Sequence, residues 1–308
     1  MMTAGDPGSY RAGVTAGAVA YLCWGLFPLY WGYLEPASPT EVLAARVVFS
    51  LACLIPLVVA LAHQTDEVRR VFADRRSVVL LAIAAALVSV NWGVFIWAVA
   101  HKHVVDTALG YFINPLVSVA LGVLVLRERL RRLQWVAVGI ASVSVLYATV
   151  SLGTPPWIAL SLAFSFGLYG LASKLSGVDA IPSMFVQTLF LMPFALAYLM
   201  WLSSRGELAF GHHGAGHTAL MVLAGPVTAL PLLLFNYAAH RVSLTLVGLL
   251  QYIAPTLQLI IGLWLLGEPM SAQRWVAFVG VWIALGVFSL DALRHARARS
   301  ASEPLPDL

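Results

Sequence analysis

The stretch "LRERLRRLQWVA" at residues 126–137 returns later in the chain as "LGEPMSAQRWVA" at residues 266–277. Both copies keep a glutamate, Glu128 in the first and Glu268 in the second. All four arginines between residues 127 and 132 are absent from the second copy. The repetition predicts two copies of one structural unit that differ in the positive charge they tolerate.

The repeat extends beyond these twelve residues. Between residues 109–137 and 249–277, aligned without gaps, nine of 29 positions are identical. The glutamates and the tryptophans Trp135 and Trp275 are among them, so we expect these side chains to be needed for packing in both copies. The alternative is two hairpin blocks that share only an apolar composition.

The composition places the chain in a membrane. Of its 308 residues, 60% are hydrophobic and 10% are charged, whereas soluble domains average about 25% charged residues. The net charge of +4 is small and scattered, which excludes a nucleic-acid binder. Cys23 and Cys53 lie in apolar runs, so we expect no disulfide.

Ten apolar runs are long enough to cross a bilayer, which takes about 20 residues. They predict an all-α integral membrane protein with two five-helix repeats, at 12–152 and 155–293. We interpret 1–11 as a short N-terminus, 63–76 and 203–216 as loops, and 294–308 as a disordered tail. The runs are 12–34, 40–62, 77–100, 104–126, 132–152, 155–174, 181–202, 217–239, 244–266 and 272–293.

The positive charges predict the orientation. Of the 18 Lys and Arg, 14 fall at one set of helix ends, three at the other, and Arg46 lies within a helix. The positive-inside rule then places both termini in the cytoplasm. Five helices per repeat is an odd number, so the second copy enters from the opposite face. The first copy's loop is then cytoplasmic and needs arginines, while the second faces outward and does not.

Inverted repeats of this kind are the architecture of secondary transporters, with a site near the midplane. Several stretches carry a resemblance to a known family: "YLCWGLFPLYW" (21–31), "NWGVFIWAV" (91–99), "GYFINPL" (110–116) and "QYIAPT" (251–256). These resemble the RarD, or chloramphenicol-sensitive protein, family of the EamA branch of drug/metabolite transporters. The resemblance implies ten transmembrane helices in two EamA repeats in the bacterial inner membrane, and a transporter, most plausibly an exporter. It implies no particular substrate.

Polar side chains at membrane depth mark candidate sites. Arg46 lies inside the second apolar run, where it is expected to face the bundle interior and contact substrate. The alternatives are that it snorkels to the headgroups or forms a structural clamp with Asp106. Asp106 and Glu41 are the carboxylates that we expect could carry a proton from outside.

Asn91 and Asn114 fall near the midplane, and Asn114 precedes Pro115. A proline removes one backbone donor and frees a carbonyl, so a broken helix is expected there. Pro255 repeats the break beside Gln251 and Tyr252. Paired breaks point to a transport site, while simple hydrogen bonding between helices is the alternative.

Trp24, Trp92, Tyr111 and Tyr252 lie deep enough to stack on a substrate, although core packing would place them similarly. The histidines of "GHHGAGH" (211–217) lie in a glycine-rich external segment, and we expect a solvated loop and no metal.

The function predicted from these features is a secondary transporter, an exporter of a small metabolite or drug. Its partners would be a small-molecule substrate and the lipid bilayer, with possible proton or ion coupling, no cofactor and no nucleic acid. No H-E-x-x-H, G-x-S-x-G or P-loop motif occurs, which argues against an enzyme or an ATP-driven pump. A membrane-embedded sensor or scaffold, or an import permease, is the alternative. Gly280 and Ala284 offer a small-residue face on the last helix, so the oligomeric state stays open.

Overall fold

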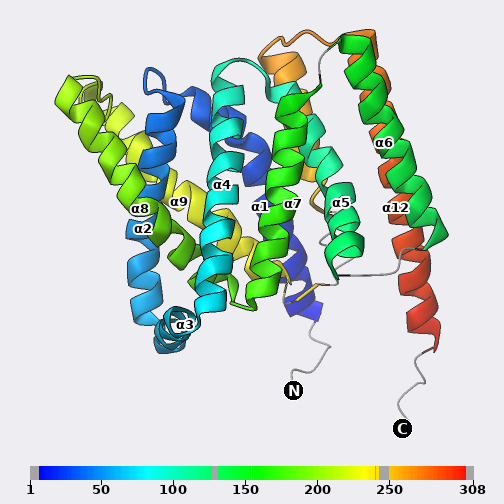
Figure 1. The fold of residues 1–308 in the computed structure, drawn as a ribbon, viewed down its shortest axis with the longest axis horizontal. Helices are drawn as coiled ribbons and strands as arrows, with labels where there is room; N and C mark the ends of the chain where they lie inside the picture. The colour runs from blue at the N-terminus through cyan, green and yellow to red at the C-terminus, as the bar shows by residue number, and fades with distance from the viewer. Residues whose placement is uncertain (1–6, 127–130, 154, 240, 243–249, 303–308) are drawn as a thin grey trace.

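The computed structural model describes residues 7–126, 131–153, 155–239, 241–242 and 250–302, and the regular structure in these ranges is helical (Figure 1). Nine of the described helices are long and apolar enough to cross a membrane, and Ile253–Leu265 is a shorter apolar helix. The fold is the predicted all-helical membrane fold. The expected span 244–266 begins outside the described residues. The elements are α1 (Pro7–Gly32), α2 (Pro39–Ala60), α3 (Ala62–Ala73), α4 (Arg75–Ala100), α5 (Val104–Leu126), α6 (Arg132–Leu152), α7 (Trp157–Ser176), α8 (Ala180–Arg205), α9 (Gly214–Ala239), α11 (Ile253–Ile260), η1 (Ile261–Leu265) and α12 (Ala272–Ser302).

Local sequence signals set several helix ends. Ser38 caps α2 by accepting the backbone N–H of Glu41 at 3.2 Å, and proline follows as the first helical residue. Asp74 caps α4, and hydrogen bonds from Ser77 hold the pKa of its carboxyl below the usual range. Glycines with positive φ follow α6, α7 and α8, a conformation that glycine adopts without steric cost: Gly153, Gly177 and Gly206.

The helix packing repeats with inverted topology. α1 packs against α9 and α11, and its counterpart α7 packs against α4 and α5, the counterparts of α9 and α11. The pairs α2–α8 and α6–α12 each join a helix to its own counterpart. Because every major contact has an image in the other half, the two halves are related as the repeated sequence predicts.

α6 and α12 lie side by side at one edge of the molecule (Figure 1). They meet so closely at Gly280 that a Cβ there would overlap the Ser144 hydroxyl. Ala284, one turn further on, is fully buried. The small-residue face of the last helix is therefore used within this chain.

Residues 63–76, expected as a loop, are largely helical in α3. The expectation was wrong because Val68, Val71 and Phe72 recur at helical spacing and give this polar segment one apolar face. Val71 and Val68 pack with Leu81 and Val186 of α4 and α8. α3 thus lies at one corner of the bundle, at the end where α4 begins (Figure 1).

The expected disorder of the tail is also wrong as far as Ser302, since α12 continues through it. Residues 294–302 are rich in alanine and arginine, which are strong helix formers, and contain no glycine or proline. The last six residues lie outside the described part of the chain.

The repeated tryptophans are not buried, contrary to expectation. Trp135 is 57% exposed and Trp275 is 41% exposed. Each lies in the first turn of its helix, α6 or α12, where an indole ring suits the boundary between lipid and water. The membrane interface accounts for the repeated tryptophan better than packing does.

Candidate functional site

Arg46 is buried inside the helix bundle, with an aromatic cage around it. Its side chain is 4% exposed, so it does not snorkel to the surface. Its guanidinium carbon lies 3.8 Å from the ring centre of Trp92, 5.1 Å from Trp31 and 5.8 Å from Phe27. Its Nε donates to the Thr228 hydroxyl at 2.8 Å. The cage brings together α1, α2, α4 and α9.

The predicted partner of Arg46 is wrong. Asp106 instead lies 3.4 Å from Arg274 and 3.1 Å from His103. Within the described residues, Arg46 forms no ion pair. An arginine at the centre of a membrane helix costs about 2.5–3.5 kcal/mol on insertion scales, and cation–π contacts recover up to about 2 kcal/mol.

Glu41 is buried near the start of α2, where one of its oxygens accepts the backbone N–H groups of Ala209 and Phe210, each at 2.9 Å. These two residues belong to the connection between α8 and α9. The carboxylate therefore ties this connection to α2. We call the end of the bundle that holds Glu41 and Asp106 the Glu41 end, and the opposite end the α3 end.

Glu268, the repeated glutamate, is also at the Glu41 end. It accepts the backbone N–H groups of Val104 at 2.6 Å and Val105 at 2.8 Å. These are the first residues of α5, whose N–H groups have no partner within the helix. The helix dipole adds a favourable field for the negative charge. The glutamate thus joins the second repeat to the first, while Glu128 lies outside the described residues.

Asn91 is the centre of a hydrogen-bond network between α4, α5 and α7. Its amide donates to the Leu162 carbonyl and to the Ser165 hydroxyl, both at 3.1 Å, and its oxygen accepts from Tyr111 at 3.3 Å. The side chain is 1% exposed. These bonds satisfy the amide and give it an interhelical packing role.

Asn114 is different, because its oxygen has no hydrogen-bond partner among the described residues. The side chain is 8% exposed and faces Gly167 of α7. The predicted break at Pro115 is absent, since α5 runs through it. A proline within a membrane helix is tolerated when its neighbours compensate for the lost bond.

The corresponding break near Pro255 is present. The chain turns at Gln251 and Tyr252, and α11 begins at the next residue. Pro255 then falls in the first turn, where its missing N–H costs nothing. Tyr252 stacks on Phe112 with ring centres 6.5 Å apart, and Gln251 is half-buried. Within the described residues, the chain therefore turns just before the proline in the second repeat and not in the first.

The half-buried Trp24 belongs to an aromatic cluster on α1 and α9. Its ring lies 5.1 Å from Tyr21 and 5.9 Å from Phe235. Its backbone carbonyl accepts the amide of Gln258 on α11 at 3.2 Å. Of the eight predicted substrate contacts, the structure joins Trp92 to Arg46, and it joins Asn91 and Tyr111 to each other. Trp24 packs against the same apolar cluster as Phe27 and Trp31 of the cage, whereas among the described residues no hydrogen bond or ring contact joins Asn114, Gln251 or Tyr252 to Arg46.

A cavity of about 250 Å³ lies toward the α3 end, between α2, α7, α8 and α9. Sequence reasoning missed its polar wall, because hydroxyl groups are common in membrane helices and give no distinct signal. The lining residues are Leu54, Tyr169, Ser173, Val178, Ala180, Ile181, Ser183, Met184, Ala229, Leu232 and Leu233.

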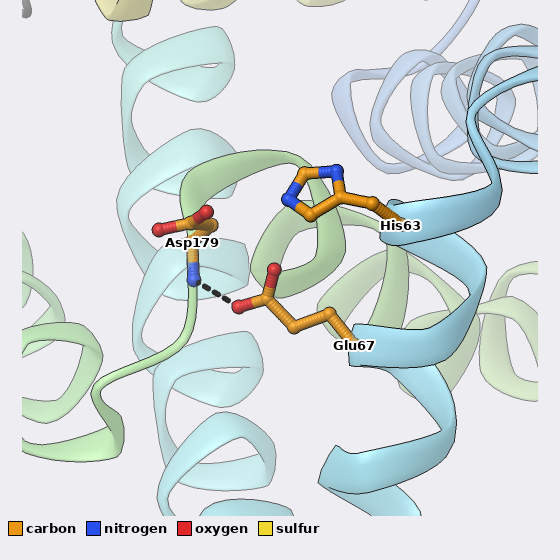
Figure 2. Close-up of side chains that lie close together, drawn as sticks. All are labelled: His63, Glu67 and Asp179. Carbon is orange, nitrogen blue, oxygen red and sulfur yellow. Dashed lines mark hydrogen bonds between the residues drawn. The ribbon is translucent and has the colours of Figure 1, made fainter.

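His63 and Glu67 of α3 face Asp179, which precedes α8 and lies between the cavity-lining residues Val178 and Ala180 (Figure 2). Their ligand atoms lie within 4.8 Å of one another, and Glu67 accepts the Asp179 N–H at 2.8 Å. This donor set could not be expected from the sequence, because α3 was not predicted. The histidines of the glycine-rich segment 211–217 are not part of this donor set. His217 forms a hydrogen bond with the Leu34 carbonyl at 3.0 Å.

The fold and the Arg46 cage define a multi-pass membrane protein with two inverted repeats around a buried arginine. The profile of the EamA-like transporter family matches the chain twice, at residues 11–150 and 155–290. Protein RarD of Streptomyces exfoliatus is 47% identical over 291 residues, covering 94% of this chain and 92% of that protein. The uncharacterized transporter YojE of Bacillus subtilis is 42% identical over 290 residues, covering 94% and 97%.

The chain belongs to the EamA-like transporter family, within its RarD group. The chloramphenicol-sensitive protein RarD of Pseudomonas aeruginosa is more distant, at 30% identity over 292 residues and 94% and 97% coverage. A solved crystal structure aligns with a TM-score of 0.57 and 19% identity, covering 92% of this chain and 98% of its own. That likeness concerns the fold alone.

Proposed function

We propose that this chain is a secondary exporter that moves a small molecule across the bacterial inner membrane by alternating access. The difference between the two ends of the bundle carries this proposal. Carboxylates tie the helices together at the Glu41 end, while the cavity lies toward the α3 end. In this conformation a substrate would enter from the α3 end.

The α3 end is assigned to the cytoplasm. Arg69 and Arg70 of α3, Arg75 and Arg76 of α4, and Arg131 and Arg132 lie at this end, as do Lys174 and Arg241. Positive charge concentrates on the cytoplasmic side of membrane proteins. A transporter whose cavity lies on the cytoplasmic side is poised to load a substrate from inside, which favours export.

The ties at the Glu41 end consist of hydrogen bonds and one ion pair between the two repeats. Glu41 and Glu268 each bond backbone N–H groups of the other half. The side chains of Arg274 and Asp106 form the ion pair between the two halves. Such polar contacts can open without exposing a large apolar area, so they suit an outer gate. α6 and α12, which pack mainly on each other, would stay as a peripheral pair.

The test compares metabolites outside cells that overproduce the wild-type chain with those outside cells that make Arg46→Gln at equal membrane level. We expect at least one compound to be enriched outside only with the wild type. A matched control, Arg205→Gln, changes an arginine that is exposed and pairs with Glu207, and it should export normally. Equal extracellular profiles for wild type and Arg46→Gln across a broad panel would contradict export through this site.

A further inference from the structure

We propose that the Arg46 cage binds the carboxylate of a small organic anion, whose apolar body packs on the surrounding rings. This substrate class rests on the proposed transport function and makes it more specific. The cage is suited to an anion because it gathers hydrogen-bond donors that the described residues leave without acceptors.

Arg46 has five N–H donors, and the described residues accept one of them, through Thr228. The indole N–H of Trp31, whose ring packs on the guanidinium, is buried without a hydrogen-bond partner. The hydroxyl of Ser50, one helical turn from Arg46 on the same side of α2, is also buried and unpartnered. A ligand with two acceptor oxygens would satisfy these groups, and arginine binds a carboxylate through two parallel hydrogen bonds.

The protein's own carboxylates cannot take this place without breaking other contacts. Glu41 is held by Ala209 and Phe210, and Asp106 is held by Arg274 and His103. A ligand whose ammonium group entered the cage, including a zwitterion, would be repelled by the positive charge of Arg46. None of the described residues places a carboxylate there to offset this repulsion. The geometry therefore selects for negative charge.

The walls of the cage select for an apolar or aromatic body. Phe27, Trp31 and Trp92 present their rings around the guanidinium. When Arg46 pairs with a ligand, these faces can pack against its carbon skeleton, because aromatic rings pair favourably at centroid distances of about 4.5–7 Å. A strongly hydrated ligand such as a sugar would lose solvation here without replacement.

The neighbouring cavity supplies the route and limits the size. Arg46, Ser50 and Leu54 lie one turn apart on the same side of α2, and Leu54 lines the cavity. On α9, Thr228 holds Arg46 while Ala229, the next residue, lines the cavity. The cavity volume of about 250 Å³ lies below the range of about 300–1,000 Å³ for drug-sized ligands, so the substrate should be smaller than a typical drug.

The binding test uses the full chain in detergent and three probes that share a phenyl ring: phenylacetate, phenylacetamide and phenethylamine. Tryptophan fluorescence and thermal stabilisation report binding. We expect phenylacetate to bind at least about tenfold more tightly than the amide or the amine, because a buried charge pair loses about this much or more when one partner is removed. Arg46→Gln should abolish the preference, and Arg46→Lys should weaken it. If Arg46→Gln fails to fold, the ranking of the probes on the wild type still decides.

A second measurement separates this inference from the proposed function. Proteoliposomes loaded with each labelled probe report its release through the wild-type chain. Release of the acid alone supports the inference. Equal or faster release of the amide or amine would overturn the substrate class while leaving the transport function in place. Binding of the acid without release would support the site and count against transport, and failure of all three probes to bind would overturn the inference.

Discussion

Nε of Arg46 lies 2.8 Å from the hydroxyl oxygen of Thr228, and this buried bond joins the first repeat to the second. The Thr228 hydroxyl donates a hydrogen bond to the Ala224 carbonyl at 2.8 Å, so its oxygen can accept from Arg46. The contact fixes the direction of the guanidinium, so that its remaining N–H donors lie within the cage.

Replacing this hydroxyl should destabilise the protein. Thr228→Val keeps the shape of the side chain but leaves a charged donor without its acceptor, and a hydrogen bond to a charged group contributes about 1.5–3 kcal/mol. We expect a loss of about 2 kcal/mol, measured by unfolding in detergent. Thr228→Ser keeps the hydroxyl and is the control. Equal stability of both variants would show that the bond to Arg46 contributes little.

Glu268 should be needed for stability at the Glu41 end. Glu268→Gln removes the charge that faces the first turn of α5 and can replace only part of the bonding to Val104 and Val105. We expect a loss of about 2 kcal/mol in unfolding free energy. Glu207→Gln, at an exposed ion pair with Arg205, should change stability by less than about 1 kcal/mol. A similar loss in both variants would count against a specific role for Glu268.

Asp106 should couple transport to external pH. Its carboxylate lies between Arg274 and His103 at the Glu41 end. Asp106→Asn removes the acidic group that both side chains contact, so the pH dependence of proteoliposome transport should disappear. A pH profile identical to that of the wild type would remove Asp106 from the coupling mechanism.

Gly280 should tolerate no side chain. In Gly280→Ala the new methyl group would overlap the Ser144 hydroxyl across the contact of α6 with α12, and overpacking costs about 1–3 kcal/mol. Gly286→Ala on the same helix meets no atom within 4 Å, and should be neutral or stabilising, since alanine is favoured over glycine in helices by about 1 kcal/mol. The two unfolding midpoints should therefore move apart, and a common shift would contradict the close contact.

Most of the fold could be predicted from the sequence, because the lipid bilayer strongly restricts which sequences can span it. Long apolar runs, the sign of the loop charges and the repeat around Pro115 and Pro255 were enough to predict two inverted halves. The exceptions, α3 and the helix after Arg294, are polar segments where hydropathy carries no signal. Their structure follows from helix periodicity and propensity.

The site was less predictable. Arg46 and Trp92 could be selected as buried groups, but their contact with Phe27 and Trp31 depends on how four helices pack. Thr228 gave no signal, since threonine is ordinary in a membrane helix. Arg46 was wrongly paired with Asp106 because two residues at the same depth in the membrane need not lie on helix faces that contact each other.

The most direct test of alternating access measures whether Ser50, one turn from Arg46, can be reached from each side of the membrane. Ser50→Cys would be made in a chain carrying Cys23→Ser and Cys53→Ser, and labelled with a membrane-impermeant thiol reagent in vesicles of known orientation. Ser183→Cys, in the cavity lining, should be labelled from the cytoplasmic side and serves as the one-sided control. We expect Ser50→Cys to be labelled from either side of the membrane when the reagent is added to that side alone. Labelling from one side only, or from neither, would contradict alternating access at this site.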